Sequence, residues 1–485
     1  MRTLLTAVLL ASSVAVASGV EQAVLLAAAR QGNAAKVAKL IADGAKANAT
    51  SPTGETALHL AAQAGDAGSA HHLLAAGAKV IANRYGVTPL HVACTMGDAA
   101  MITLLLDGGA EITLATPDGR TPLMIAAQTG RPEAVRLLLA RGADANARES
   151  TQFQTVLMWA AAEGHVETVK TLLAAGADLK ARSKAGFTAL LFAVRHGRIW
   201  VVDTLLDAGA DPNEALLAGM NATAGASALA LAVTNQHYEL GARLLAMGAE
   251  PNYSWQGRTV LHLITWVSRP GAGSNDPAPE GSGKMDRLTF VRTLVKHGAD
   301  VNRRMLKSRG GPRTVLNLAG ATPFLLAART ADAELMRLLI ELGADPRLPN
   351  SDGTTPLMVA AGIGVQSPGE DPGTESEVLE AVRIAVECGN DVNAVDGNGE
   401  TVMHGVAYKW AASSVPFLVA HGARVEQWNR KNNQGWTPLR IATGVHRGMN
   451  LRGSPSTAAA LREVMTAAGV SIEVEPETNI SGGTK

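Results

Sequence analysis

Apolar residues recur along the chain in short stretches with helical spacing. In Pro132–Ala140 (PEAVRLLLA), Val135, Leu138 and Leu139 stand at i, i+3 and i+4, which places them on one face of an α-helix. Gly142 follows, at the point where a helix commonly ends. Because a short helix pair with one apolar stripe cannot bury that stripe alone, it has to stack on further pairs. The pattern predicts an all-α protein built from stacked helix pairs.

The helical pattern returns with a period close to 33 residues. The element TALH at Thr56 returns as TPLH at Thr88, and the first five copies are 32, 33, 34 and 33 residues apart. The opening Thr or Ser caps a helix N-terminus, and the proline that often follows fits the first helical position. A glycine precedes the opening residue by two positions in ten of the eleven copies, with Phe153 in the other, and such a glycine suits a tight hairpin turn. The eleven copies open at Thr56, Thr88, Thr121, Thr155, Thr188, Ser227, Thr259, Thr322, Thr355, Thr401 and Thr437.

This repeat resembles the ankyrin repeat, which has a period of about 33 residues and the signature T-P-L-H-x-A. With a leader copy at residues 23–50 that lacks the signature, the resemblance covers residues 21–474. It implies one solenoid of about twelve helix–turn–helix units joined by β-hairpin loops, where length alone would suggest about three domains. It also implies that the signature histidine hydrogen-bonds backbone between repeats. That histidine is His59, His91, His262 or His404 in the copies that carry it.

Extra residues interrupt the period in the C-terminal half, at 268–286, 305–320, 363–374 and 444–456. We place them at the turn between the two helices of a repeat, so that several would lie on one face. Long surface loops cost little folding free energy, and neutral drift therefore explains them as well as a customised binding surface does. Both explanations stay open.

Residues 1–19 are predicted to be a signal peptide. Arg2 gives a basic start, residues 4–17 form an apolar run (LLTAVLLASSVAVA), and Ala15 and Ala17 are the small residues that a signal peptidase reads. A buried N-terminal helix is the alternative. The run is too short to anchor the chain in a bilayer, and no later segment is apolar enough to span one. We expect export to the periplasm or medium of a bacterial cell, and a polar tail at residues 475–485.

Composition and charge argue against several functional classes. Lys and Arg total 43 and Asp and Glu total 43, so the chain lacks the basic excess that nucleic acids demand. Two cysteines, Cys94 and Cys388, cannot form a disulfide framework or a zinc ribbon. The histidines recur at repeat positions, which indicates scaffold roles, and Cys94 is expected to be a buried, inert thiol. Because no catalytic or nucleotide-binding motif appears, we predict no enzymatic activity, metal or cofactor.

The chain is poor in aromatic residues, with 7 Trp, 4 Tyr and 6 Phe, yet several of them stand at hairpins where a core does not need them. Aromatic and Arg side chains are common anchors of protein interfaces. The resemblance places a concave binding groove at the hairpin tips and at the end of the first helix of each repeat. Each such aromatic could instead pack on the neighbouring hairpin, and Trp159 is assigned to the core. We predict partner contacts at Arg84, Tyr85, Val87, Met96, Arg120, Gln128, Gln152, Phe153, Glu163, Phe187, Arg195, His196, Trp255 and Trp436.

The function predicted from these features is a monomeric, non-enzymatic scaffold that binds another protein in its groove. The alternative is a small-ligand or enzymatic site built on the irregular C-terminal repeats, which the insertions 268–286 and 363–374 motivate. A purely structural spacer is a third interpretation.

Overall fold

The computed structural model describes residues 20–217, 223–267, 269, 279–306, 316–365, 372–445 and 453–474. The predicted signal peptide and the polar tail lie outside these residues, as do the central parts of the four predicted insertions. The chain divides into two compact units. Unit 1 contains the residues up to Asp211 together with Leu216–Gly219, and unit 2 contains Pro212–Ala215 and the residues from Met220 onward.

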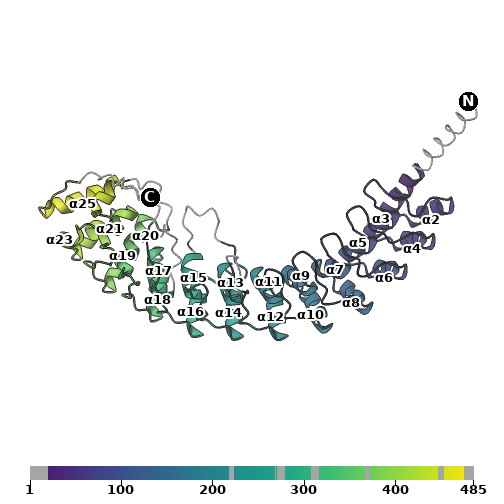
Figure 1. Ribbon diagram of the computed structural model, residues 1–485, viewed down its shortest axis with the longest axis horizontal. Coiled ribbons are helices and arrows are strands. Elements are labelled where there is room, and N and C mark those ends of the chain that lie inside the picture. Colours follow the sequence, from purple (N-terminus) through teal and green to yellow (C-terminus); the bar gives the residue numbers. More distant parts are fainter. Residues whose placement is uncertain are drawn as a thin grey trace, which may run out of the picture. The chain divides into compact units, whose positions relative to one another are not determined.

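Unit 1 is a stack of helix pairs, arranged in two layers (Figure 1). The first helices of successive pairs contact one another in chain order from α3 to α11, and the second helices do the same from α2 to α12. Each pair is thus covered by the next one. The helices of unit 1 are residues 20–30, α2 (Ala34–Ala42), α3 (Ala57–Ala64), α4 (Ala67–Ala75), α5 (Pro89–Met96), α6 (Ala99–Asp107), α7 (Pro122–Gln128), α8 (Pro132–Ala140), α9 (Val156–Glu163), α10 (Val166–Ala174), α11 (Ala189–Arg195) and α12 (Ile199–Asp207).

Unit 2 repeats this arrangement with less regular connections. Its first helices α13, α15, α17, α19, α21 and α24 contact one another in that order. The helices of unit 2 are α13 (Ala228–Thr234), α14 (Tyr238–Ala246), α15 (Val260–Val267), α16 (Arg287–Lys296), α17 (Pro323–Arg329), α18 (Ala333–Glu341), α19 (Pro356–Ala361), α20 (Glu375–Glu387), α21 (Val402–Lys409), α22 (Ser414–Ala420), α23 (Val425–Trp428), α24 (Pro438–Thr443) and α25 (Pro455–Ala467).

Short sequence signals set both ends of the first helices. The side-chain oxygen of Thr56 accepts a hydrogen bond from the backbone N–H of His59 (N···O 3.4 Å), and the Thr56 N–H donates to the His59 ring Nδ1 (3.1 Å). This reciprocal capping box satisfies amides that the start of a helix leaves unpaired. α3 then ends at Gly65, whose φ of 66° is a left-handed conformation that glycine adopts without strain. The predicted helix starts are confirmed in this way.

Small residues line the core between the two layers and let neighbouring backbones approach closely. The bounds of α8 match the helix expected there, and Val135 and Leu138 are fully buried. Leu139 is only half-buried, and Ala134 takes the third buried position of the helix. The apolar stripe is therefore rotated slightly from the predicted one. Fully buried alanines of the first helices include Ala61, Ala62, Ala126, Ala127, Ala160 and Ala161.

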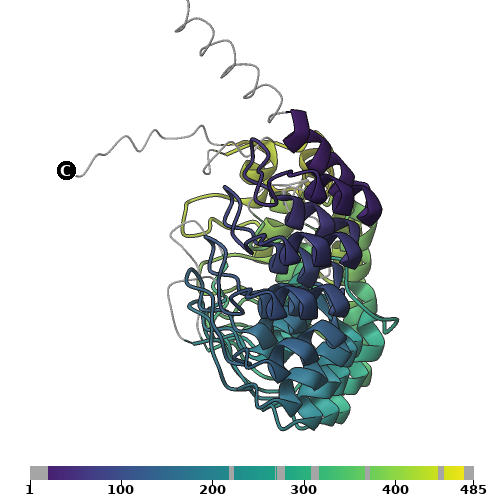
Figure 2. The same cartoon turned by 90° about the vertical axis from the view of Figure 1, so that its right-hand side faces the viewer.

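The loops between successive pairs form the expected hairpins, but the described residues contain isolated β-bridges and no strands. Thr50 bridges to Thr56 at the base of one hairpin. The tip glycine Gly54 has a φ of 82°, and Phe153, which replaces the glycine in its copy, is also left-handed with a φ of 56°. Figure 2 shows the loops of unit 1 leaving its helices on one side.

Three of the four insertions lie where they were predicted, between the two helices of a repeat. Residues 268–286 connect α15 to α16, residues 363–374 connect α19 to α20, and residues 444–456 connect α24 to α25. Residues 305–320 were misplaced, because they belong to the hairpin that joins α16 to α17. Among the described residues, no helix combines the length and apolarity needed to cross a membrane. The predicted all-α architecture of stacked helix pairs is confirmed within both units.

Candidate binding surface

The signature histidines are structural. The His59 ring Nε2 lies 2.9 Å from the backbone oxygen of Val87, which belongs to the next repeat, and His262 and His404 make the corresponding contacts at 3.2 and 3.1 Å. Burial lowers the pKa of His262 and of His404 to about 4, so both rings are neutral at pH 7. The His91 Nε2 is buried and has no hydrogen bond of accepted geometry. For three of the four histidines the predicted contact between repeats is therefore confirmed.

The other titratable residues give little support to catalysis. Cys94 is fully buried in α5, and burial raises the pKa of its thiol far above the usual range. A thiolate nucleophile is therefore unfavourable at this position. Within the described ranges, no group of three or more His, Cys, Asp or Glu side chains is placed to hold a metal ion.

In unit 1, several hairpin tips are tied to their neighbours by backbone hydrogen bonds. The Arg84 N–H donates to the Thr53 carbonyl of the preceding tip (3.1 Å), and the Lys184 N–H donates to the Gln152 carbonyl (2.7 Å). Each bond joins the tip of one repeat to the tip of the next, so the side chains at these four tips stand on supported parts of the hairpin edge. A supported edge of this kind suits binding, because little conformational entropy is lost when a partner docks.

Exposed apolar side chains stand on this edge and beside it. Tyr85 is 67% exposed and Phe153 is 49% exposed, both at hairpin tips, and Met96 at the end of α5 is 51% exposed. Aromatic side chains bury much area at a low entropic cost, which makes exposed ones effective interface anchors. Tyr85 and Phe153 therefore have the exposure that partner contact requires.

A charged side chain connects one hairpin tip of unit 1 to the end of a first helix. Arg120 pairs with Asp118 (2.6 Å) and donates to the side chain of Gln128 at the end of α7 (3.2 Å). Further along, the guanidinium of Arg195 lies 5.5 Å from the ring centroid of Phe187. The predicted contact residues fall into three groups. Arg84, Tyr85, Met96, Gln152, Phe153, Glu163, Arg195 and His196 are exposed; Val87, Arg120, Gln128, Trp255 and Trp436 are half-buried; Phe187 is buried.

Three of the predicted aromatic contacts are less exposed than Tyr85 and Phe153. Phe187 is 5% exposed and packs against Phe192 at a centroid distance of 4.9 Å, so it stabilises its own repeat. The Trp255 indole Nε1 donates to the Ala224 carbonyl of the adjacent hairpin (2.9 Å). Both Trp255 and Trp436 are half-buried and lie in unit 2, whereas Tyr85 and Phe153 lie in unit 1. Trp159, assigned to the core, is also half-buried.

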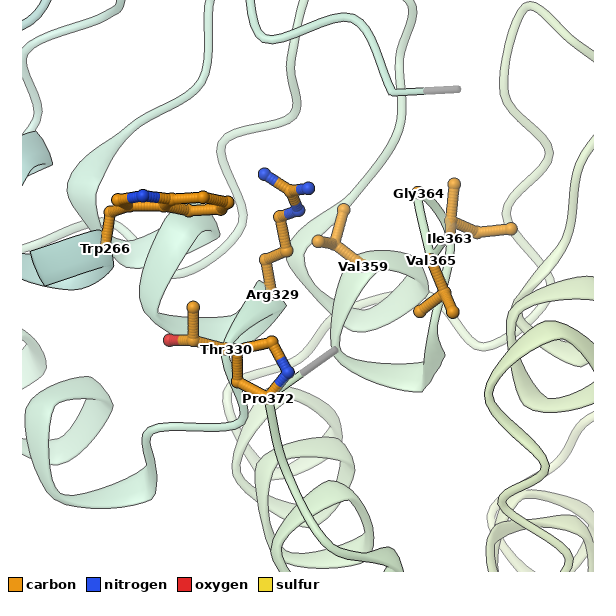
Figure 3. Close-up of a pocket in the computed structure, with 8 residues that line it drawn as sticks. All are labelled: Trp266, Arg329, Thr330, Val359, Ile363, Gly364, Val365 and Pro372. Carbon is orange, nitrogen blue, oxygen red and sulfur yellow. The ribbon is translucent and has the colours of Figure 1, made fainter. Parts of the chain in front are cut away.

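A pocket in unit 2 contains residues that the sequence prediction did not include. Gln128 and Arg195 each stand seven residues after the opening Thr of their repeat, and the same position is Trp266 in α15 and Arg329 in α17. Trp266 is 53% exposed, and the Arg329 guanidinium lies 5.4 Å from the centroid of its indole. Figure 3 shows Arg329 standing between Trp266 and Val359. The pocket is lined by Trp266, Arg329, Thr330, Val359, Ile363, Gly364, Val365 and Pro372.

The repeats match known sequence families. The family described as ankyrin repeats (3 copies) matches residues 24–116, 81–149, 97–183 and 146–215, and the single ankyrin repeat matches residues 319–351. The chain is 33% identical over 223 residues to ankyrin repeat and SOCS box protein 16 of Mus musculus, and this match covers 44% of this chain and 46% of that protein. It is 33% identical over 113 residues to ankyrin repeat and SOCS box protein 6 of Homo sapiens, covering 23% of each.

These curated relatives are therefore matched over less than half of their length. Among solved structures, the chain is similar to the human ASB11 ankyrin repeat domain, with 31% identity and a TM-score of 0.41, over 47% of this chain and 98% of that one. The family matches cover the regular pairs of unit 1 and the pair formed by α17 and α18 in unit 2. Residues 24–215 and 319–351 are therefore ankyrin repeats.

Proposed function

We propose that this protein is a non-enzymatic scaffold that binds another protein through the hairpin tips and groove of unit 1. The observation that carries the proposal is the edge on which Tyr85 and Phe153 stand. Both rings are about half exposed or more, and the tips around them are joined by backbone hydrogen bonds. The polar residues of the signature are meanwhile used for capping and for contacts between repeats. The surface therefore offers anchors for a partner without a group suited to chemistry.

We further propose that the chain is exported to the periplasm or medium of a bacterial cell and acts there as a monomer. The support is the sequence of residues 1–19, which has a basic start, an apolar run and the small residues Ala15 and Ala17. Cleavage is expected after Ala17 or Gly19. The mass of the mature chain, isolated from its native host, tests the export. A mass that begins after residue 17 or 19 supports it, and a chain that retains Met1 in the cytoplasmic fraction contradicts it.

Crosslinking in the native host, followed by mass spectrometry, tests the scaffold function. In the double variant Tyr85→Ala/Phe153→Ala, the yield of crosslinked partner is expected to fall at least about tenfold, because interface anchors of this type contribute on the order of 1–2 kcal/mol or more each to the free energy of binding. Trp200→Ala is a matched control, since Trp200 is 69% exposed but lies on the second helix α12. Equal recovery of the partner by the wild type and the double variant would show that the tips do not bind it.

The alternative of a ligand or enzymatic site in the irregular repeats has one observation in its favour, the pocket beside Trp266. This pocket borders the insertions 268–286 and 363–374. Apart from arginines, the titratable side chain near it is His262, which lines the adjoining pocket and is held neutral between repeats. The pocket is therefore better suited to binding than to proton transfer.

A further inference from the structure

The leader repeat of unit 1 leaves an open pocket next to the first hairpin. Its first helix, residues 20–30, carries Ala23 and Ala27 where the next repeat has Thr56 and Leu60. A larger side chain replaces Ala27 in every later repeat of unit 1, namely Leu60, Val92, Ile125, Trp159 and Phe192. The space that the alanines leave is a pocket of about 410 Å³, a size typical of ligand sites. This leader pocket is lined by Gln22, Ala23, Leu26, Ala27, Arg30, Thr50, Ser51, Pro52 and Leu60.

Most of the surface inside the leader pocket is apolar. Leu60 of α3 is 1% exposed, and Leu26 of the first helix is half-buried. Ala23 and Ala27 lie on the same helix as Leu26, and the ring of Pro52 lines the pocket from the hairpin. An apolar side chain that enters the pocket removes its own area and that of these residues from water. The pocket therefore favours an apolar group of the size of Leu or Phe.

Arg30 supplies the charge at the leader pocket. It is exposed, and its guanidinium forms no ion pair or hydrogen bond with any residue that the structure describes. Glu21 lies on the opposite side of the helix from Arg30, because successive helical residues are turned by about 100°. The Glu55 side chain accepts a hydrogen bond from the Thr53 hydroxyl (3.2 Å) and does not line the pocket, and residues 1–19 contain Arg2 but no Asp or Glu. The rim of the pocket is therefore complementary to a carboxylate.

The hairpin beside the pocket is continuous with the tip that carries Tyr85. The Ser51 hydroxyl accepts the Glu55 N–H (3.1 Å), and the Thr53 carbonyl accepts the N–H of Arg84, the residue before Tyr85. Pro52 stands where the next hairpin has Arg84, and proline has no N–H to donate to a further strand. The outer edge of this hairpin is therefore unsuited to strand pairing. A partner that covers Tyr85 can instead insert a side chain into the adjoining leader pocket.

We propose that the leader pocket binds an apolar side chain of the partner segment that covers Tyr85, and that a carboxylate on the next residue of this segment pairs with Arg30. The apolar side chain fills the space left by Ala23 and Ala27 and supplies most of the affinity. The ion pair lies at the exposed rim, where it contributes less to affinity than to the choice of partner. The proposal rests on the proposed scaffold function and defines the partner chemistry at the N-terminal end of that site.

Binding of two tetrapeptides to the purified full chain, measured by fluorine NMR, tests this proposal. Both contain para-fluorophenylalanine, which is followed by Glu in one peptide and by Lys in the other. We expect the Glu peptide to bind about fivefold more tightly than the Lys peptide. Ala27→Leu should weaken binding of the Glu peptide at least about tenfold, because the new side chain fills the pocket. Arg30→Gln should bring the affinities of the two peptides to within about twofold of each other.

Two control variants make the result specific. Ala100→Leu adds the same side chain at an exposed position of α6, and Lys36→Gln removes an exposed charge from α2. Neither should change binding of the Glu peptide, and circular dichroism melts should show that all variants remain folded. Unchanged affinity of Ala27→Leu, or equal affinity of the wild type for the two peptides, would overturn the proposal. A loss of affinity in Ala100→Leu as large as that in Ala27→Leu would also overturn it, because binding would then not depend on the pocket.

The experiment separates this proposal from the proposed function. If neither peptide binds, but Tyr85→Ala/Phe153→Ala still reduces partner crosslinking, the leader pocket is rejected as a binding site and the scaffold function stands. If the Glu peptide binds as expected while partner crosslinking does not depend on Tyr85 and Phe153, the pocket stands as a binding site. The hairpin tips are then rejected as anchors, and with them the continuous partner segment proposed to join Tyr85 to the pocket.

Discussion

The side chain of Glu149 holds the hairpin tip that presents Phe153. Glu149 is buried, and its carboxylate accepts hydrogen bonds from the backbone amides of Gln152 (2.7 Å) and Gln154 (3.1 Å) on either side of Phe153. Between them Phe153 keeps a left-handed φ of 56° and exposes half of its ring. A strained conformation at an exposed position costs some stability. Under the proposed scaffold function, this cost is offset by the placement of the Phe153 ring as an anchor for the partner.

Phe153→Gly is expected to raise the free energy of unfolding by up to about 1 kcal/mol, because glycine adopts a positive φ without the steric cost that a side chain carries. The same variant should bind the crosslinked partner more weakly, since the ring is lost. Chemical denaturation and crosslinking yield measure the two effects. Phe153→Ala is the control: it also removes the ring but keeps the backbone cost. An unfolding free energy lower for Phe153→Gly than for Phe153→Ala would contradict the assignment of strain.

Glu149→Ala should destabilise the same hairpin by about 1–3 kcal/mol, because it leaves buried backbone amides without their acceptor. Burial raises the pKa of Glu149, but hydrogen bonds from Thr151, Gln152 and Gln154 outweigh it, and the net pKa is lowered. The stability it contributes is therefore present above the ordinary Glu pKa and is lost as the pH falls through the folded value. Hydrogen–deuterium exchange at the hairpin measures both effects. Glu133→Ala, on the exposed face of α8, should leave exchange there unchanged.

Leu138→Ala in α8 should lower the free energy of unfolding of its repeats by about 2–5 kcal/mol, because a fully buried side chain is replaced by a cavity. Leu139→Ala is an adjacent control with the same chemistry, but its side chain is half-buried, so the loss should be roughly half of that or less. Urea denaturation followed by circular dichroism compares them. Equal losses for the two variants would mean that the stripe of α8 is rotated from the position found.

The helices could be predicted because each carries its own signals. Thr56 and Gly65 determine the ends of α3 through bonds within a few residues, so no knowledge of distant contacts was needed. The repeat family followed from the same local motifs. The division into two units was not predicted, although the 39 residues between Thr188 and Ser227 exceed the period and mark the region where it occurs.

The exposure of single side chains could not be predicted from the hairpin sequences. Phe187 is the residue immediately before the capping Thr of its repeat. Ala321 and Glu400 stand at the same position of their repeats and are also buried, because the chain there is returning from the hairpin to the first helix. Phe153 stands one residue earlier in its copy and remains exposed. Trp266 was missed for a different reason: it stands seven residues after Thr259, as Arg195 stands seven residues after Thr188, but the predicted contacts at this repeat position were limited to the N-terminal repeats. Such differences depend on which neighbour covers a side chain, which only the fold determines.

Acid should destabilise unit 2 through His262 and His404. Burial lowers the pKa of each ring to about 4, below the unfolded value of about 6.5, so the unfolded chain binds protons first as the pH falls. Their neutral contacts are fully available above about pH 6.5, and stability is lost between about pH 6.5 and 4, by up to about 3 kcal/mol for each histidine. Hydrogen–deuterium exchange of α15 and α21 across this range measures the loss. In His404→Asn the exchange of α21 should depend less on pH, whereas His297→Gln, at an exposed position, should leave the profile unchanged. A wild-type profile that is flat from pH 7 to pH 4 would show that these rings are not held neutral by burial.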